Sequence, residues 1–375
     1  MKHIKGFPYN VQNPIVGRIT FGKSLLNRSN DILVSKDAVA PSIGYIATIT
    51  VSTSFRSNRK PYFIVDNTDI FSEGDVVTLH PNGDILFVYE RHSMYNALMV
   101  TELCNHRCLM CPQPPVAKEH ARILQNLQII SLMSKHTAEI GLTGGEPTMI
   151  GDDLFVLIHR IKKKLPRTSI SILSNGVKFA DKNYALKLAK CKHYDLQIDV
   201  PLFSDIAREH NRIVGANTFY KTVQGLYNLA TFHQRIGLRM VIHKQTYKRL
   251  PQFAEFVYRN FPFVVQIAFM QMETVGYAKD NINDLWMDPH DYNKELREAV
   301  LLLHRKGMKV FIYNAQLCVL PEDIRRFAVQ SISDWKDVYI SECEGCTLKG
   351  KCAGFFASDI NHHSSHIHRI LKLQA

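Results

Sequence analysis

The sequence predicts an α/β protein whose middle part is a partial (β/α)6 barrel of the TIM type. Six strand-like segments alternate with amphipathic helical segments between residues 96 and 285. Serial βα units imply a parallel sheet, because parallel neighbours need a long crossover that is usually helical. Two further regions complete the predicted organisation: a β-rich accessory domain over residues 1–95 and a cysteine-rich region over residues 286–375.

The N-terminal region is β-rich in its pattern and contains a strong hairpin signal. In "SEGDVVTLHPNGDILFVYE", two strand-like runs flank Asn82-Gly83. Asn-Gly supplies the positive backbone angles that tight hairpin turns require. No cluster of chemically reactive side chains occurs in this region, so its sequence indicates no role.

The predicted barrel strands are short and rich in apolar and β-branched residues. They are "ALMVTEL", "AEIGLT", "TSISILS", "YDLQIDV", "GLRMVIH" and "FVVQIAFM". The helices between them include "ARILQNLQIISLMSK" and "GDDLFVLIHRIKKKL", and a further helix is predicted near "HDYNKELREAVLLLHRKG". The remainder of the C-terminal region is expected to be irregular and ends in the His-rich "NHHSSHIHRI", which we interpret as a solvated terminus, with metal binding as the alternative.

The composition is that of an ordinary globular protein, with 46% apolar and 21% charged residues. No apolar run reaches the roughly 18 residues that span a bilayer, and the start lacks the apolar segment of a secretory signal. We therefore expect a cytoplasmic protein without membrane contact, in which clustered cysteines hold metal more often than they form disulfides. The formal charge of +12 permits a nucleic-acid partner, but the basic residues are scattered and the run "RIKKKLPR" is typical of a solvated helix end.

Three cysteines directly follow the first barrel strand, at the rim where barrel enzymes carry their active sites. Cys104, Cys108 and Cys111 are spaced C-x3-C-x2-C, one thiol too few for a closed four-thiolate site. Three thiolates suit three irons of a [4Fe–4S] cluster and leave the fourth iron open to a small ligand. The alternative is a zinc site completed by His106 or by a remote residue.

The loops after the next strands place more polar groups at the same rim. Gly144, Gly145 and Glu146 form "GGEP", where paired glycines allow close approach of a ligand and the carboxylate can hold an ammonium group. Ser174 and Asn175 follow the third strand. Their joint placement at one rim, more than any single residue, indicates a binding site.

Strands four and five carry polar residues that would face into the barrel. In strand four, Asp195, Gln197 and Asp199 alternate with apolar residues, and strand five carries Arg239 and His243. A polar face inside a barrel is costly unless something polar binds there. These strands therefore favour a polar ligand inside the barrel.

C-x3-C-x2-C followed by GGEP on six βα units resembles the radical S-adenosylmethionine (SAM) enzymes, over residues 96–285. The resemblance implies that the methionine amino and carboxylate groups of SAM chelate the open iron. It also implies a set of cofactor-binding residues along the barrel rim. The set comprises Gly144, Gly145 and Glu146 at the amino group, Ser174, Asn175 and Asp199 around the methionine and ribose, and Met110, Gly276 and Tyr277 around the adenine. Arg239 of strand five is a further cofactor-binding candidate.

The chemistry that this resemblance implies is one-electron chemistry. The reduced cluster would donate an electron to the sulfonium, and a 5′-deoxyadenosyl radical would abstract hydrogen from the substrate. Met110 occupies a position that is often aromatic in the family. A methionine there can make apolar contact with adenine but cannot stack on it.

A second set of cysteines lies in the C-terminal region: Cys318, Cys343, Cys346 and Cys352. Four thiolates with a CxxC core fit an auxiliary [4Fe–4S] cluster or a structural zinc. We favour the cluster, because the protein would already depend on iron–sulfur assembly. The remaining Cys191 is predicted to be a buried free thiol.

The combination of "TELCNHRCLMCPQPP", "LTGGEPTMIGDDLF", "GLYNLATF" and "CEGC" is similar to the C-type radical SAM maturases of the His-Xaa-Ser system. This resemblance implies a ribosomally made peptide or small protein with His-Xaa-Ser repeats as substrate. It also implies a sister maturase and an electron donor such as flavodoxin or ferredoxin. Two alternatives stay open: a radical SAM enzyme acting on RNA, and a zinc-binding interaction module without catalysis. The sequence contains no recognised RNA-binding motif.

Overall fold

The computed structural model describes residues 2–22, 28–36, 44–55, 57, 60–119, 122–330, 338–360 and 362–371. The chain divides into two compact units. Unit 1 comprises residues 1–100, 120–142 and 152–170, and unit 2 comprises residues 101–119, 143–151 and 171–375. Within the described ranges, no helix has the length and apolar character that a bilayer crossing requires.

Unit 1 contains a mixed eight-stranded sheet with the order β1-β8-β7-β3-β4-β5-β6-β2. Its strands are β1 (His3–Lys5), β2 (Phe7–Tyr9), β3 (Ile15–Thr20), β4 (Arg28–Ser35), β5 (Tyr45–Thr50), β6 (Tyr62–Ile64), β7 (Val76–Leu79) and β8 (Asp84–Tyr89). Strands β7 and β8 form the predicted antiparallel hairpin, closed by the His80 amide donating to the Asp84 carbonyl at 2.8 Å. Strands β3 to β6 pair in parallel.

The two ends of this sheet are joined by the start of the chain. Strand β1 pairs with β8 at one end and β2 pairs with β6 at the other, yet only Gly6 separates β1 from β2. Gly6 donates its amide to the Gly83 carbonyl at 2.9 Å, and a Cβ on Gly83 would lie 2.4 Å from the Gly6 carbonyl oxygen. The sheet therefore closes on itself around an apolar core that includes Ile19, Ile49 and Phe63. Among the described strands, closure leaves only the short β1 and β2 at the ends of the sheet.

Two helices of the barrel region belong to unit 1. These are α1 (Ile123–Leu132) and α2 (Asp153–Lys164). Gln128 of α1 donates to the Val16 carbonyl of β3 at 3.2 Å, and Tyr89 of β8 shares a 3.0 Å hydrogen bond with Thr137. The last turn of α2 carries exposed Lys162–Lys164, so the basic run is a solvated helix end as predicted.

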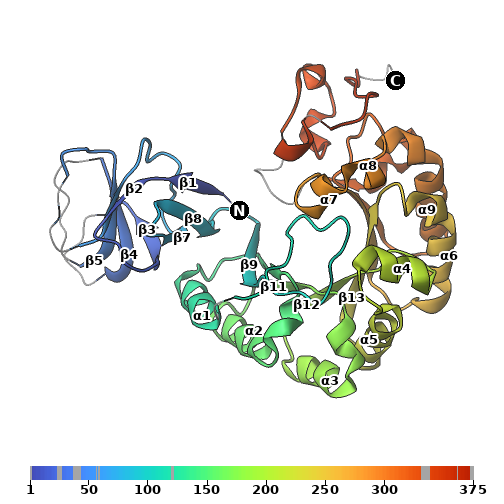
Figure 1. Cartoon of the computed structure of the whole chain (residues 1–375), viewed down its shortest axis with the longest axis horizontal. Coiled ribbons are helices and arrows are strands. Elements are labelled where there is room, and N and C mark those ends of the chain that lie inside the picture. The colour runs from blue at the N-terminus through green and yellow to red at the C-terminus, as the bar shows by residue number, and fades with distance from the viewer. Residues whose placement is uncertain are drawn as a thin grey trace. The chain divides into compact units, whose positions relative to one another are not determined.

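The second sheet has the order β16-β15-β14-β13-β12-β11-β10-β9 (Figure 1). Its strands are β9 (Tyr95–Thr101), β10 (Glu139–Gly144), β11 (Ser169–Leu173), β12 (Leu196–Pro201), β13 (Arg235–Ile242), β14 (Gln266–Gln271), β15 (Val310–Tyr313) and β16 (Ala328–Val329). Strands β9, β10 and β11 begin in unit 1 and end in unit 2. Strands β12 to β16 pair in parallel, so their carboxyl ends meet at one rim.

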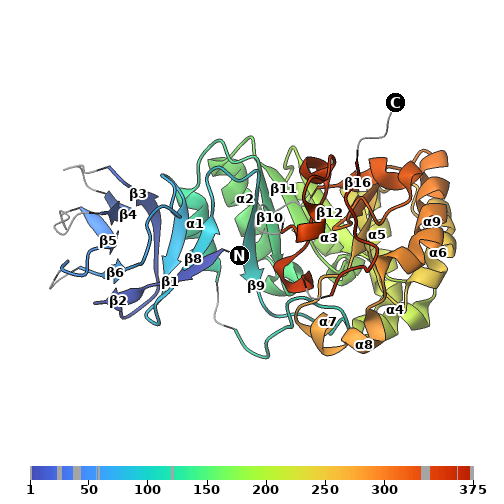
Figure 2. The same cartoon turned by 90° about the horizontal axis from the view of Figure 1, so that it is seen from above.

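The helices of unit 2 cover the outer side of the sheet or cap its rim. They are α3 (Lys182–Lys190), α4 (Ala207–Val214), α5 (Phe219–Thr231), α6 (Leu250–Asn260), α7 (Tyr277–Asp280), α8 (Ile282–Leu285) and α9 (Asn293–Arg305). Helices α6 and α9 lie side by side on the outer side (Figures 1 and 2). Helix α9 buries Leu296, Ala299, Val300 and Leu303, the i, i+3, i+4, i+7 stripe of an amphipathic helix.

Short 3-10 turns complete the connections. They are η1 (Pro147–Ile150), η2 (Val177–Ala180), η3 (Tyr247–Arg249), η4 (Pro289–Tyr292), η5 (Glu322–Phe327), η7 (Ser341–Cys343), η8 (Lys349–Lys351) and η9 (Ala357–Asp359). All six predicted strands are present as β9 to β14. The prediction of six strands was nevertheless wrong by two, because β15 and β16 extend the sheet. Four and two residues are too short to show a strand period in the sequence.

Candidate functional site

The loop that carries Cys104, Cys108 and Cys111 is held by backbone hydrogen bonds to the end of α4 and the start of α7. The Arg107 and Leu109 amides donate to the last carbonyls of α4, both at 2.9 Å. The Tyr277 amide, at the start of α7, donates to the Cys111 carbonyl at 2.9 Å. Helix ends leave carbonyls without intrahelical partners, and here the cysteine loop satisfies them. The loop is therefore held by backbone hydrogen bonds to both α4 and α7.

The three thiols of this loop are close enough to influence one another. Burial first, and then mutual electrostatic repulsion, raises the pKa of Cys108 above its ordinary value. The same two causes, with the nearby Glu146 carboxylate, raise the pKa of Cys104 to about 11. Three neighbouring thiolates in a buried loop would repel strongly unless positive charge lies between them. The donor set thus fits an iron–sulfur cluster, whose irons supply that charge.

The thiols are not arranged around a single ion. In the part of the chain that the structure describes, no group of three or more His, Cys, Asp and Glu side chains is placed to hold one metal. Thiolates on three different irons of a cube need not converge on one point. His106, the sequence-based fourth ligand of the zinc alternative, lies with its Nε2 2.9 Å from Thr218 Oγ1. Burial lowers the pKa of His106 to about 4, so the ring is neutral near pH 7.

The GGEP loop packs directly on the first residues of the cysteine loop. The Gly145 amide donates to the Thr101 carbonyl and the Glu146 amide to the Leu103 carbonyl, both at 2.8 Å. A Cβ on Gly144 would lie 1.9 Å from the Thr101 carbonyl oxygen, and one on Gly145 would lie 2.2 Å from that of Leu103. The two glycines therefore allow close approach of the chain's own backbone, whereas the sequence suggested close approach of a ligand.

Glu146 is fully buried and hydrogen-bonded, which the sequence did not reveal. Its Oε1 accepts from the Thr148 amide, the Thr148 hydroxyl and the Ser174 hydroxyl at 3.0, 2.6 and 2.8 Å, and its Oε2 accepts from the Asn175 amide at 2.6 Å. Burial raises the pKa of this carboxyl against the lowering effect of those donors. Asn175 in turn donates to Asn105 Oδ1 at 2.6 Å, beside Cys104. Glu146 is thus a hub that ties the loops after β10 and β11 to the cysteine loop.

Asp199 and Arg239 lie together inside unit 2. Asp199 Oδ1 accepts from Gln197 Nε2 at 2.9 Å, and burial raises the Asp199 pKa while the Arg239 guanidinium opposes that rise. A Cβ on Gly237 would lie 2.0 Å from Asp199 Oδ1, so a glycine in β13 makes room for the carboxylate. The polar face predicted for the fourth barrel strand, β12, is present at Gln197 and Asp199. It is wrong for Asp195, which precedes β12 and forms an ion pair with the half-exposed Arg235.

The residues that were predicted to line the adenine lie in the cysteine loop or pack against it. Met110 is 5% exposed. A Cβ on Gly276 would lie 2.6 Å from the Cys111 carbonyl oxygen, at a positive φ of 58° that favours glycine. Asn281, which sequence reasoning missed, donates to the Leu109 carbonyl at 2.9 Å. The segment after β14 therefore abuts the cysteine loop, and Gly276 permits that contact.

All four C-terminal cysteines line one pocket, together with residues that include Tyr339, Phe355 and Ile367. The Leu317 amide donates to Cys352 Sγ and the Ile370 amide to Cys346 Sγ, both at 3.4 Å. Sequence-distant thiols with amides aimed at their sulfurs are typical of iron–sulfur sites, where such bonds tune the potential. Four thiolates are also the donor type of a structural zinc, but among the described residues no three such groups are placed around one metal ion. Cys191 is 1% exposed and lies outside this pocket.

The C-terminal region is hydrogen-bonded to the segment after β14. Asp359 Oδ1 accepts from the Thr274 amide and hydroxyl at 3.0 and 2.5 Å. Thr274 lies two residues before Gly276, which abuts Cys111. A continuous set of contacts thus runs from the region of the second cysteine set to the first. In the His-rich tail, His366 stacks on His290 with ring centroids 3.8 Å apart, and Asn361 lies outside the described residues.

Comparison with known proteins agrees with this geometry. Residues 98–257 match the model of the Radical SAM superfamily. This segment belongs to that superfamily. It contains the first cysteine set, the GGEP loop and strands β10 to β13, so the motif and the fold lead to the same assignment.

Sequence relatives share only part of their length with this chain. It is 25% identical over 195 residues to a GTP 3′,8-cyclase of Desulforamulus reducens, covering 50% of this chain and 58% of the relative. It is 30% identical over 117 residues to a GTP 3′,8-cyclase of Petrotoga mobilis, covering 30% and 36%. The chain spans about half the length of the curated relatives it matches.

Solved structures share the fold at low identity. The structure titled native anSMEcpe with bound AdoMet and Kp18Cys peptide has a TM-score of 0.50 and 14% identity, covering 74% of this chain and 92% of that chain. SuiB of Streptococcus suis has a TM-score of 0.47 and 15% identity, covering 59% and 50%. The likeness to the anSMEcpe structure supports the fold over most of the chain.

We predict that Glu146→Ala lowers both stability and SAM affinity. Removal of the carboxylate leaves the buried donors of Thr148, Ser174 and Asn175 without an acceptor, which costs about 1–3 kcal/mol of unfolding free energy. If Glu146 also receives the SAM amino group, the dissociation constant for SAM rises about ten- to a hundredfold. Urea unfolding and equilibrium dialysis measure the two effects.

Thr148→Val is the matched control, since it removes one hydroxyl donor and leaves the carboxylate in place. It should change SAM affinity far less than Glu146→Ala. A loss of stability in Glu146→Ala with an unchanged SAM dissociation constant would show that Glu146 only supports the loops.

We also predict that anaerobically reconstituted protein binds about eight irons if both cysteine sets hold cubane clusters. Replacement of the four C-terminal cysteines by Ala should leave about half of that iron. Cys191→Ser is the control and should not change the iron content, because Cys191 lies outside the pocket. About four irons and one zinc in the parent protein would instead identify a structural zinc site.

Proposed function

We propose that this protein is a radical SAM enzyme that modifies a ribosomally made peptide or small protein bearing His-Xaa-Ser repeats. The observation that carries the enzymatic part is the joint packing of the Cys104–Cys111 loop, the GGEP loop and the Ser174-Asn175 loop in unit 2. Each of these loops follows a different strand of a parallel sheet. Their meeting at one rim is the arrangement in which a barrel builds an active site.

In this proposal the three thiols hold a [4Fe–4S] cluster whose open iron binds SAM. When bound, the cluster and SAM together supply the 5′-deoxyadenosyl radical that abstracts hydrogen from the substrate. The chain's own residues position these groups. Glu146 fixes the loops around the cluster, and Asp199 with Arg239 presents a polar pair inside unit 2 for the methionine and ribose.

The C-terminal cysteines favour a peptide-modifying role within the superfamily. In this proposal they would hold an auxiliary [4Fe–4S] cluster, which would supply an electron acceptor. The resemblance of the sequence to C-type maturases of the His-Xaa-Ser system, which runs over most of the chain, supports the substrate, a sister maturase as partner and a flavodoxin or ferredoxin as electron donor. The formal charge of +12 favours an acidic leader or carrier segment on that substrate.

A nucleotide substrate is the second candidate. It is favoured by the sequence similarity to proteins named GTP 3′,8-cyclases, which covers about half of this chain in the Desulforamulus relative. An RNA substrate is compatible with the basic charge. We rank both below the peptide, because the resemblance to peptide maturases includes the C-terminal cysteines.

We predict that the triple variant Cys104→Ala/Cys108→Ala/Cys111→Ala forms no 5′-deoxyadenosine from SAM under anaerobic reduction. The variant lacks every thiolate that could hold the open-iron cluster. Chromatography of the reaction with parent protein, the triple variant and Cys191→Ser as control measures the product. Formation of 5′-deoxyadenosine by the triple variant at the rate of the parent would exclude this cysteine set as the cluster site.

We further predict that a His-Xaa-Ser repeat protein loses about two mass units per modified unit, since hydrogen abstraction followed by oxidation removes two hydrogens. Mass spectrometry after anaerobic incubation with enzyme, SAM and reductant, with and without the sister maturase, measures this change. Parallel reactions contain GTP or RNA. The peptide assignment would be wrong if the peptide kept its mass both with and without the sister maturase, while SAM was cleaved productively only in the presence of GTP or RNA. GTP or RNA would then be the substrate.

A further inference from the structure

The C-terminal tail, residues 362–371, runs along the second cysteine set. Ile367, His368 and Ile370 line the same pocket as the four thiols of that set. The Ile370 amide donates to Cys346 Sγ at 3.4 Å. An N–H group directed at a thiolate sulfur stabilises negative charge on that sulfur. The tail is therefore a part of the second site, although its sequence contains no cysteine.

Ile370 is held by the residue that directly follows Cys346. Its carbonyl oxygen accepts from the Thr347 amide and from the Thr347 hydroxyl, both at 2.9 Å. Together with the Ile370 amide bond to the Cys346 sulfur, these contacts join the same two short stretches of chain. The Ile370 amide is thus directed at the sulfur by bonds that do not involve a metal.

A second amide of the tail lies near Cys318. Burial raises the pKa of Cys318, and the His368 backbone amide acts against that rise. His368 Nδ1 lies 2.9 Å from the His366 carbonyl oxygen, a contact within the same turn of the tail. Two thiols that are distant in sequence are therefore approached by backbone amides of one short segment.

The start of the tail is attached to η4 by contacts that we call the anchor. Asp288 Oδ2 accepts from the Ser365 amide at 2.9 Å and from the Ser365 hydroxyl at 3.1 Å. The His366 ring stacks on the His290 ring, with centroids 3.8 Å apart and an interplanar angle of 16°. Asp288 Oδ1 also accepts from the His290 amide at 2.9 Å, so one carboxylate orders both parts of the anchor.

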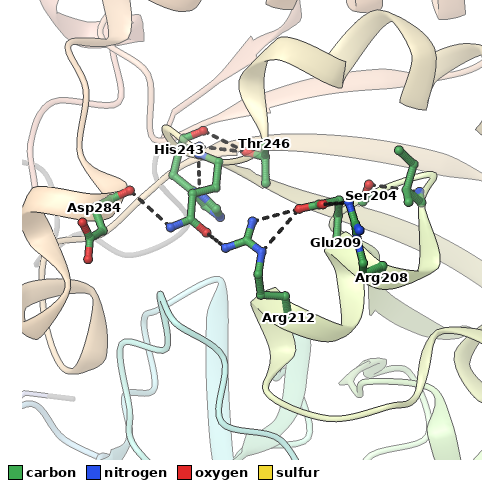
Figure 3. Close-up of polar contacts among 9 residues, drawn as sticks. Ser204, Arg208, Glu209, Arg212, His243, Thr246 and Asp284 are labelled. Carbon is green, nitrogen blue, oxygen red and sulfur yellow. Dashed lines mark hydrogen bonds and ion pairs between the residues drawn. The ribbon is translucent and has the colours of Figure 1, made fainter.

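The segment that carries Asp288 is itself bonded to the loop after β13. Gln245 Nε2 donates to the Asp284 carbonyl at 3.4 Å, and Arg212 of α4 donates to Gln245 Oε1 at 2.5 Å (Figure 3). The tail is therefore attached at its start to the barrel part of unit 2 and at its end to the second cysteine set.

Hydrogen bonds to cysteine sulfurs are one of the factors that set the reduction potential of an iron–sulfur cluster. Reduction adds one electron, and part of its charge lies on the thiolate sulfurs. An N–H donor therefore stabilises the reduced cluster more than the oxidised one and raises the potential. The Ile370 amide at Cys346 and the Leu317 amide at Cys352 are two such donors. A higher potential makes a cluster a better electron acceptor, which is the role of the second site in the proposed function.

We infer that Ile370 is a positioning residue whose backbone amide raises the reduction potential of an auxiliary [4Fe–4S] cluster at the second cysteine set. The anchor at Asp288 and the bonds from Thr347 hold that amide in place. The couple concerned is the gain of one electron by the cluster, and no bond or proton of the protein changes. This inference rests on the proposed function for the identity of the cluster.

The test compares three variants of the full-length protein. Ile370→Pro lacks the backbone N–H, because proline has none. Ile370→Ala keeps the N–H and loses only the side chain. Arg369→Pro places the same ring at a neighbouring amide, which makes no hydrogen bond within the described part of the chain.

Anaerobic redox titration followed by electron paramagnetic resonance (EPR) measures the potential of each cluster. In the proposed function SAM binds only the open iron of the first cluster, so the signal that SAM leaves unchanged belongs to the second. We expect Ile370→Pro to shift that potential about 59 mV to the negative side, which is about tenfold in the equilibrium constant of a one-electron couple. Ile370→Ala and Arg369→Pro should keep the potential of the parent.

Isotope labelling tests the same contact without a proline variant. Protein labelled with ¹⁵N-isoleucine should show a ¹⁵N coupling to the reduced second cluster in pulsed EPR, because the Ile370 amide donates to a ligand sulfur. Ile370→Ala carries no label at this amide. It should lose the coupling while its potential stays that of the parent.

Several results would overturn the inference. They are an unchanged potential in Ile370→Pro with parental iron content and melting temperature, an equal shift in either control variant, and a labelled parent without the coupling. If Ile370→Pro loses the second cluster or the fold, the labelling result decides.

The proposed function is tested separately. Zinc in place of a second cluster in the parent would overturn both this inference and the auxiliary cluster of the proposed function. Formation of 5′-deoxyadenosine reports on the first cysteine set alone. A parent that forms 5′-deoxyadenosine and holds two clusters, but whose second potential does not depend on the Ile370 amide, would count against this inference alone.

Discussion

The buried carboxylate of Glu146 is the interaction on which the arrangement of the site depends. A carboxylate with four donors orders every group that donates to it, and here those donors come from the loops after two different strands. Asn175 passes this order to Asn105, beside the first cysteine. The backbone of the same GGEP loop meets the carbonyls of Thr101 and Leu103. The cysteine loop is therefore positioned by hydrogen bonds from the GGEP loop and Asn175, and also by its hydrogen bonds to the end of α4.

The two cysteine sets share a physical problem and differ in how the chain solves it. Buried thiolates close together are unstable without positive charge, and burial raises the pKa of Cys104 in the first set and of Cys318 in the second. The first set occupies one short loop, so local backbone bonds suffice to gather it. The second set joins Cys318 to residues about 25 to 34 positions later, and only tertiary packing against Phe355 and Ile367 brings these thiols to one pocket.

The contacts between Asp359 and Thr274 give the C-terminal region a structural part in the first site. Thr274, Gly276 and Tyr277 belong to one segment that is bonded at one end to the tail and at the other to Cys111. Displacement of the tail would therefore remove a support of the cysteine loop. The closed sheet of unit 1 has a different character, because its two ends are joined at Gly6 and it encloses a cluster of apolar side chains.

The sequence alone determined the parallel sheet, its first six strands, the hairpin of unit 1 and both cysteine sets, because period, turn chemistry and short motifs are local properties. Strands β15 and β16 were missed because four and two residues carry no readable period. The tertiary structure decided the role of Glu146, since no local pattern shows that four donors from two loops would surround one carboxylate. It also decided that Gly144 and Gly145 lie against the chain's own carbonyls of Thr101 and Leu103. Such facts depend on which distant segments meet, and that depends on the packing of the whole unit.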